Sequence, residues 1–150
     1  MRIDRNVPFP DGAWWALRIG LGVGPFLAGL DKFFNLLTDW TMYLNPWVAS
    51  ILPMSPAAFM RAVGVIEMVV GAAILAGITR FGGYVAAAWL VGIAVNLVTT
   101  GHYFDVAVRD VAMAIAAFTL ARLTEAGVGA DVRSRSAAAS ILGDRQRIPA

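Results

Sequence analysis

The sequence predicts an all-α integral membrane protein, a four-helix antiparallel bundle with a short interfacial helix between the first two spans. The first observation is composition: 59% of the 150 residues are hydrophobic and 15% are charged, whereas soluble domains average about 25% charged residues. A soluble chain of this length could not bury so much apolar surface. The second observation is a set of long apolar segments, and the third is the shortness of the connections between the later ones.

Four apolar segments are long enough to cross a bilayer, because a spanning helix needs about 20 residues to cover about 30 Å of hydrocarbon. The predicted spans are Ala13–Leu37, Ala57–Ile78, Gly82–Thr100 and Phe104–Leu123. Acidic residues and prolines interrupt residues 1–12, and no small-residue cleavage site follows a short apolar core. We therefore expect the first span to be retained rather than removed as a signal peptide.

Residues 38–56, which join the first two spans, are predicted to lie on the membrane surface. Trp40 and Trp47 give this segment the aromatic character of chains at the headgroup level. We expect a short helix here, broken by Pro46 and ended near Pro53.

The later connections are tight, which makes neighbouring spans antiparallel. They cover residues 79–83 and 100–105. After Leu123 the sequence becomes small, polar and basic. This change predicts a flexible cytoplasmic tail over residues 124–150, with at most a brief surface helix at Ala137–Leu142.

The distribution of Lys and Arg predicts the orientation of the protein. Arginines occur in the N-terminal residues 1–12, in the second connection and in the tail, whereas residues 38–56 contain no Lys or Arg. We therefore expect a multi-pass protein of the cell inner (cytoplasmic) membrane with both termini in the cytoplasm. The aromatic segment then faces outward.

Composition also excludes several kinds of chemistry. The chain contains no cysteine, which excludes disulfides, thiolate metal sites and thiol nucleophiles. Its single histidine, His102, cannot build a histidine-cluster zinc site or a bis-histidine haem within one copy. The net charge of +2 gives no reason to expect nucleic acid binding. We predict no metal site and no intrinsic cofactor, and we assign no catalytic residue.

Polar side chains nevertheless occur inside every predicted span, mostly in the outer half. They are candidates for a buried polar network or a ligand-binding site: Arg18, Asp31, Lys32, Glu67, Asn96, His102, Asp105, Arg109 and Asp110. A charged side chain left facing lipid at a helix centre costs at least about 2.5–3.5 kcal/mol. We therefore expect these charges to face inward and to pair with one another.

Several details of this network stay open at this point. Asp105 and Arg109 have the favourable i,i+4 order for an ion pair. Glu67 is either part of a balanced set of charges or protonated, because desolvation favours the neutral carboxyl. Arg18 lies near the cytoplasmic end, where snorkelling to the headgroups is the alternative to pairing. His102 is expected to be an interfacial hydrogen-bonding residue rather than a metal ligand.

Small residues accompany the polar groups on the same helix faces. In lipid, small residues let helices approach closely, so we predict that the polar faces are also the packing faces. The faces consist of Arg18, Gly22, Pro25, Gly29 and Lys32, with a second stripe of Gly20, Gly24 and Asp31 beside them; Gly64, Glu67 and Gly71; and Ala88, Gly92 and Asn96.

Two segments resemble a known family. LRIGLGVGPFLAGLDKFF, Leu17–Phe34, resembles the first helix of DoxX-type membrane proteins, with an early arginine, central glycines and a later lysine. GVIEMVVGAAILAGITRFGG, Gly64–Gly83, is similar to the second helix of that family, with a glutamate, a following glycine and a TR-containing turn. The resemblance extends over the four spans.

The resemblance implies a four-helix membrane bundle in which Arg18, Lys32 and Glu67 match recurrent polar positions. Arg109 and Asp110 are less securely part of the shared pattern. The family takes its name from a subunit of an archaeal quinone-linked sulfur oxidation system. The resemblance therefore implies that a quinone is a possible cofactor. Thiosulfate chemistry through the chain's own thiols is excluded, because the chain contains no cysteine.

These observations leave three functions open. The first is an accessory or scaffold subunit of a larger membrane complex linked to electron transfer. The second is a quinone-binding oxidoreductase component in which Lys32, Glu67 and Arg109 contact the headgroup. The third is a small transporter or proton pathway through the same charges. The expected partners are the lipid bilayer and other membrane subunits or further copies of this chain.

Overall fold

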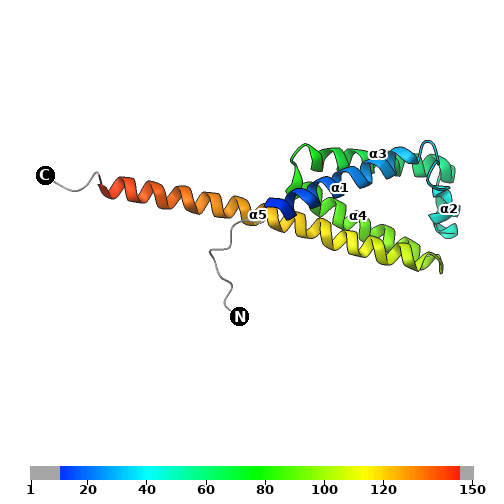
Figure 1. The fold of residues 1–150 in the computed structure, drawn as a ribbon. Coiled ribbons are helices and arrows are strands. Elements are labelled where there is room, and N and C mark those ends of the chain that lie inside the picture. The colour runs from blue at the N-terminus through cyan, green and yellow to red at the C-terminus, as the bar shows by residue number, and fades with distance from the viewer. Residues whose placement is uncertain (1–10, 146–150) are drawn as a thin grey trace.

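A computed structural model describes the backbone of residues 11–145 and the side chains of residues 12–129, 135 and 136. All regular structure in this range is helical, which confirms the predicted fold class (Figure 1). The helices are α1 (Asp11–Asp31), the 3₁₀ helix η1 (Trp40–Tyr43), α2 (Pro46–Ile51), α3 (Pro56–Leu75), α4 (Thr79–Thr99) and α5 (Phe104–Arg145).

The four long helices are arranged as two pairs. Helix α1 packs along α3, helix α4 packs along α5, and fewer contacts join the two pairs (Figure 1). All four helices meet in one apolar core made of Leu21, Ile74, Ala86, Ala117 and Leu120. Elements η1 and α2 lie at the end of the bundle opposite to the start of α1.

Glycines set the close approach of α1 and α3. A Cβ atom built on Gly64 would lie 2.5 Å from the carbonyl oxygen of Gly29, and one on Gly71 would lie 2.5 Å from that of Gly22. The two backbones therefore touch, which confirms that these small-residue faces are packing faces. The prediction is wrong for the face of Ala88, Gly92 and Asn96. A Cβ atom on Gly92 would meet nothing within 4 Å, so no other helix of the same chain packs closely against it.

The outer surface is as apolar as a lipid environment requires. In the described part of the chain, three helices are long and apolar enough to cross a membrane: Gly12–Asp31, Pro56–Leu75 and Thr79–Thr99. Large hydrophobic side chains such as Ile19, Val69 and Val95 are exposed along them. A fourth crossing by α5 remains a prediction.

The first helix is shorter than predicted, because α1 ends at Asp31 and not at Leu37. The Asp31 carboxylate accepts hydrogen bonds from the backbone N–H groups of Leu36 and Leu37, at 3.0 and 3.1 Å. Asn35 adopts a φ angle of +51°, which turns the chain away from the helix axis. Lys32 consequently lies just after the helix and not within it.

Pro46 begins the short helix α2 instead of breaking a longer one. The Asn45 side chain accepts a hydrogen bond from the Trp47 N–H at 2.8 Å, and proline follows it at the first helical position. The helix ends at Ile51, before Pro53, as expected. Its position at the membrane surface stays a prediction.

The last helix is longer than predicted, because α5 continues from Leu123 to Arg145 and extends beyond the bundle (Figure 1). Its 42 residues span about 63 Å at 1.5 Å per residue. Residues 124–145 were expected to form a flexible tail, but no proline interrupts them and Thr124 is held by contacts to Trp14 and Thr79. The expected N-terminal segment 1–12 lies almost wholly outside the described residues, as do residues 146–150.

Candidate functional site

A buried ion pair joins α1 to α3. Lys32 Nζ lies 2.5 Å from Glu67 Oε2, and the two side chains are only 4% and 10% exposed. The ammonium group also lies 3.4 Å from the Ala28 carbonyl oxygen. The contact of Gly29 with the backbone at Gly64 brings the two helices close enough for this pair. The pairing of these two predicted charges therefore follows from the glycine faces.

Trp40, at the start of η1, covers the ion pair. The Lys32 ammonium lies 3.8 Å from the centre of the Trp40 ring, which gives a cation–π contact. The Trp40 indole N–H donates a hydrogen bond to Asp31 Oδ2 at 2.8 Å. Asp31 thus has a positioning role, because one carboxylate both ends α1 and holds Trp40 over Lys32.

The residue before Trp40 secures this cover. Asp39 accepts hydrogen bonds from the Thr41 hydroxyl at 2.6 Å and the Thr41 N–H at 3.0 Å. These two bonds, chiefly the one from the hydroxyl, hold the pKa of Asp39 below its usual value of 3.8. The ionised carboxylate caps η1 and fixes the backbone that carries Trp40.

Helices α4 and α5 each send one polar group toward the pair. The indole nitrogen of Trp89 is buried and has no hydrogen bond of good geometry with the described residues, although it lies close enough to the Glu67 carboxylate for a weak one. The Asp110 carboxylate is buried and interacts with both Lys32 and Glu67. We call Lys32, Trp40, Glu67, Trp89 and Asp110 the polar cluster; they come from both helix pairs.

Arg109 lies at the rim of the polar cluster. Its Nε atom is 3.8 Å from Asp110 Oδ1, and its side chain is 68% exposed. The ion pair that we predicted between Asp105 and Arg109 is absent from the described structure, and both side chains are exposed. Arg109 therefore provides only a loose counter-charge to Asp110.

The remaining predicted site residues lie apart from the polar cluster. Arg18 donates to the carbonyl oxygens of Ile74 and Leu75, at 3.1 and 2.5 Å, and so satisfies the C-terminal end of α3. Its guanidinium also lies 5.2 and 4.8 Å from the rings of Trp14 and Trp15. Its predicted membership of the network is wrong, because it binds at the C-terminal end of α3, about two turns beyond Glu67.

Asn96 on α4 binds the segment that carries η1 and α2. Its amide donates to the Tyr43 carbonyl at 2.7 Å and accepts from the Asn45 N–H at 3.2 Å, which ties η1 and α2 to α4. His102 is exposed, and its backbone N–H contacts the Thr100 hydroxyl at 3.1 Å. These two residues shape the end of the bundle that carries η1 and α2, and neither joins the polar cluster.

The polar cluster combines a close ion pair with two groups that have weaker partners. Lys32 and Glu67 form the ion pair, the Trp89 N–H has no well-formed hydrogen bond among the described residues, and the Asp110 carboxylate has the exposed Arg109 as its counter-ion at 3.8 Å. Sequence reasoning missed both tryptophans, because an aromatic residue near a membrane surface gives the same signal as an anchor. Such a set can hold helices together, hydrogen-bond a small polar group or bind a proton.

Comparison with known proteins assigns the family. The DoxX family model matches residues 13–102, more than half of the chain, and this region contains Arg18, Lys32 and Glu67. The match stops before α5, so Arg109 and Asp110 lie outside it. No curated protein and no solved structure matches the chain. The helical fold, the apolar spans and this match together show that the chain belongs to the DoxX family of membrane proteins.

Proposed function

We propose that this protein is an accessory, scaffold-type subunit of a larger membrane complex linked to electron transfer. The observation that carries the proposal is the buried Lys32–Glu67 pair, in which each charge satisfies the other under the Trp40 ring. A satisfied pair between two helices fixes their register, which is the best-attested use of buried charges. The link to electron transfer comes from kinship with the family rather than from a residue of this chain.

The outer surface supports a docking role. Glycines at positions 20, 24 and 92 would accept a Cβ atom without meeting any atom within 4 Å. In contrast, the glycines of the α1–α3 contact are filled by the neighbouring backbone. Because small residues allow close helix approach in lipid, the open glycines leave room for helices of partner subunits or of a second copy.

The proposed orientation places both chain ends in the cytoplasm of a cell with an inner membrane. Helix α1 begins and α5 leaves the bundle at the same end, while η1 and α2 lie at the opposite end (Figure 1). Arg80 and Arg122 lie at the first of these ends, and residues 38–56 contain no Lys or Arg. The positive-inside rule favours this orientation.

Purification in a mild detergent tests the scaffold proposal. The protein should co-purify with larger subunits in a fixed ratio, and Gly24→Leu or Gly92→Leu should lower that ratio without lowering the yield of the chain itself. Glu67→Gln should lower the yield, since it leaves Lys32 unpaired. Asp105→Asn removes an exposed carboxylate and serves as the control. Recovery of the wild-type chain alone from native membranes would refute the proposal.

Quinone binding is the second candidate, and the buried indole N–H of Trp89, which has no well-formed hydrogen bond among the described residues, favours it. A carbonyl oxygen of a quinone headgroup would satisfy such a donor. Extraction of the purified protein should then yield quinone, and Trp89→Phe should lose it while keeping the fold. Equal quinone content in wild type and Trp89→Phe would exclude this site.

A small transporter or proton pathway is the remaining alternative, and the electrostatic contact between Glu67 and Asp110 is the feature that favours it. It predicts flux into liposomes that contain this protein alone. Flux that Glu67→Gln abolishes would support the pathway, whereas liposomes without flux would exclude it.

A further inference from the structure

Two arginines from different helices share one carboxylate at the end of the bundle where α4 begins. Arg80 Nε lies 2.9 Å from Glu125 Oε1, and Arg122 Nη1 lies 2.6 Å from Glu125 Oε2. The arginine side chains are 71% and 61% exposed, whereas Glu125 is only 24% exposed. The trio therefore carries one excess positive charge, with the cations on the outside.

Most of the guanidinium donors in this trio are unused by the carboxylate. A guanidinium has five N–H donors in a fixed planar arrangement, and Glu125 accepts one hydrogen bond from each arginine. Glu125 thus leaves most donors of Arg80 unused, whereas Arg122 also interacts with the Tyr84 hydroxyl. Such an arrangement suits an anion with several oxygen atoms.

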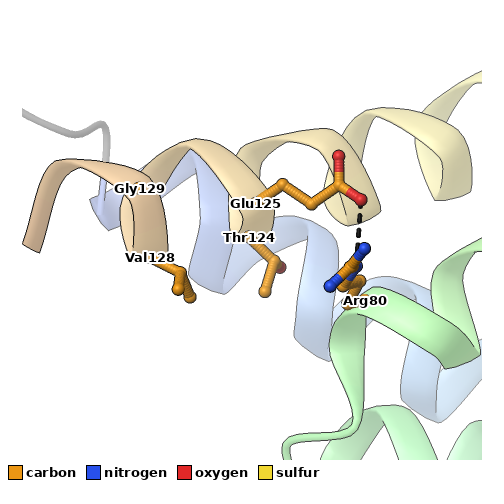
Figure 2. Close-up of a pocket in the computed structure, with 5 residues that line it drawn as sticks. All are labelled: Arg80, Thr124, Glu125, Val128 and Gly129. Carbon is orange, nitrogen blue, oxygen red and sulfur yellow. Dashed lines mark hydrogen bonds and ion pairs between the residues drawn. The ribbon is translucent and has the colours of Figure 1, made fainter. Parts of the chain in front are cut away.

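A groove lies beside this trio. It has a volume of about 360 Å³ and is lined by Arg80, Thr124, Glu125, Val128 and Gly129 (Figure 2). In Figure 2 the Arg80 guanidinium reaches from α4 toward Glu125 on α5, and the Thr124 and Val128 side chains lie along the same stretch of α5. A Cβ atom on Gly129 would meet nothing within 4 Å, so the groove is open on that side.

We expect the groove to lie at the depth where headgroups meet acyl chains. Arg80 is in the first turn of α4, whose residues Thr79–Thr99 form a candidate membrane span. The adjacent Phe81 is 70% exposed, and Phe118, one turn before Arg122 on α5, is 50% exposed. Cationic groups therefore border an apolar surface that faces the lipid tails.

We propose that this groove binds the phosphate group of an anionic phospholipid, with two phosphate-binding residues: Arg80, which lines the groove, and Arg122, which lies outside the lining and pairs with the other oxygen of Glu125. Planar guanidinium groups bind phosphate oxygens in pairs, and basic pockets between membrane helices bind anionic headgroups. Free phosphate has the same charge chemistry but no acyl chain to cover Phe81 and Phe118, so the exposed aromatics favour a lipid. This inference is independent of the proposed scaffold function.

Native mass spectrometry of the full-length protein in detergent tests the site with two probes, phosphatidylglycerol and phosphatidylcholine. Wild type should retain phosphatidylglycerol preferentially. Arg80→Gln and Arg122→Gln should each lower this retention about fivefold, the effect of one basic residue near an anionic surface. The matched control is Arg61→Gln, which changes an exposed arginine near the start of α3. Equal retention of both lipids, or an equal loss in the control, would overturn the proposal.

Glu125→Gln separates a lipid site from a purely structural ion-pair network. The lipid site predicts stronger retention of phosphatidylglycerol, because a competing negative charge is removed. A purely structural role predicts that Glu125→Gln and Arg80→Gln weaken the retention of phosphatidylglycerol alike. That result would overturn the proposal, even if the arginine variants fold poorly. Inorganic phosphate is the last probe. If it displaces phosphatidylglycerol at millimolar concentration, the ligand is a free anion and the lipid assignment is wrong.

Discussion

The two helix pairs are held together in different ways. Helices α1 and α3 meet through backbone contacts at glycines and a buried ion pair between Lys32 and Glu67. Helices α4 and α5 also meet at a glycine, since a Cβ atom on Gly83 would lie 2.8 Å from the Ala117 carbonyl oxygen, but the arginine of their ion pair, Arg80–Glu125, is largely exposed. The Lys32–Glu67 pair is buried where water is excluded, whereas water competes for the charges of the Arg80–Glu125 pair. Breaking the buried pair should therefore cost much more free energy of unfolding than breaking the exposed one.

The largest expected effect comes from breaking the buried pair. Glu67→Gln should destabilise the protein by about 3–5 kcal/mol, because Lys32 is left buried without a counter-charge. The double variant Lys32→Met with Glu67→Leu should be closer to wild type, since it removes both charges. Thermal unfolding in detergent measures both variants. Equal destabilisation by the single and the double variant would show that the cost does not come from leaving Lys32 without its counter-charge.

The next largest effect tests the glycine contact. Gly71→Leu should cost about 1–3 kcal/mol or more, because the new side chain must displace the α1 backbone at Gly22. Gly92→Leu on α4 is the matched control, since its Cβ atom meets nothing within 4 Å. The same unfolding measurement should separate these two variants. A stable Gly71→Leu protein would mean that α1 and α3 can move apart without loss of the fold.

The difference between the pairs also explains what the sequence could predict. The spans now seen as α3 and α4 were located within three residues at each end, because apolar length determines where a helix crosses. The meeting of Lys32 with Glu67 was predictable for a related reason: a charge in hydrocarbon needs a partner. Both arguments depend on the lipid environment and need no tertiary detail.

Other features could not be predicted in this way. The end of α5 was placed at Leu123 because hydropathy falls there, but falling hydropathy marks the end of a membrane segment and not of a helix. Asp105 and Arg109 had suitable spacing, yet Arg109 lies near Asp110 instead. The cover that Trp40 forms over Lys32 depends on the fold of the turn after Asp31, which no local pattern encodes.

A smaller effect is expected on the α4–α5 side. Glu125→Gln should change the free energy of unfolding by only about 0–1 kcal/mol, because both arginine partners are largely exposed and water screens the interaction. Raising the salt concentration should weaken even this contribution. Unfolding of wild type and Glu125→Gln at low and high salt provides the measurement. A loss as large as that of Glu67→Gln would remove the distinction between the two helix pairs.

The smallest effect concerns pH and the cover over the buried pair. The pKa of Asp39 is lowered in the folded protein by the Thr41 hydroxyl and N–H, so its contribution to stability is present above its usual value of 3.8 and is lost as pH falls through the lower folded value. Hydrogen exchange of η1 should therefore accelerate as the pH falls through this range, after correction for intrinsic exchange. Asp39→Asn should remove that component, whereas Asp105→Asn on the α4–α5 side should leave it unchanged. Identical pH profiles in wild type and Asp39→Asn would mean that Trp40 is held by Asp31 alone.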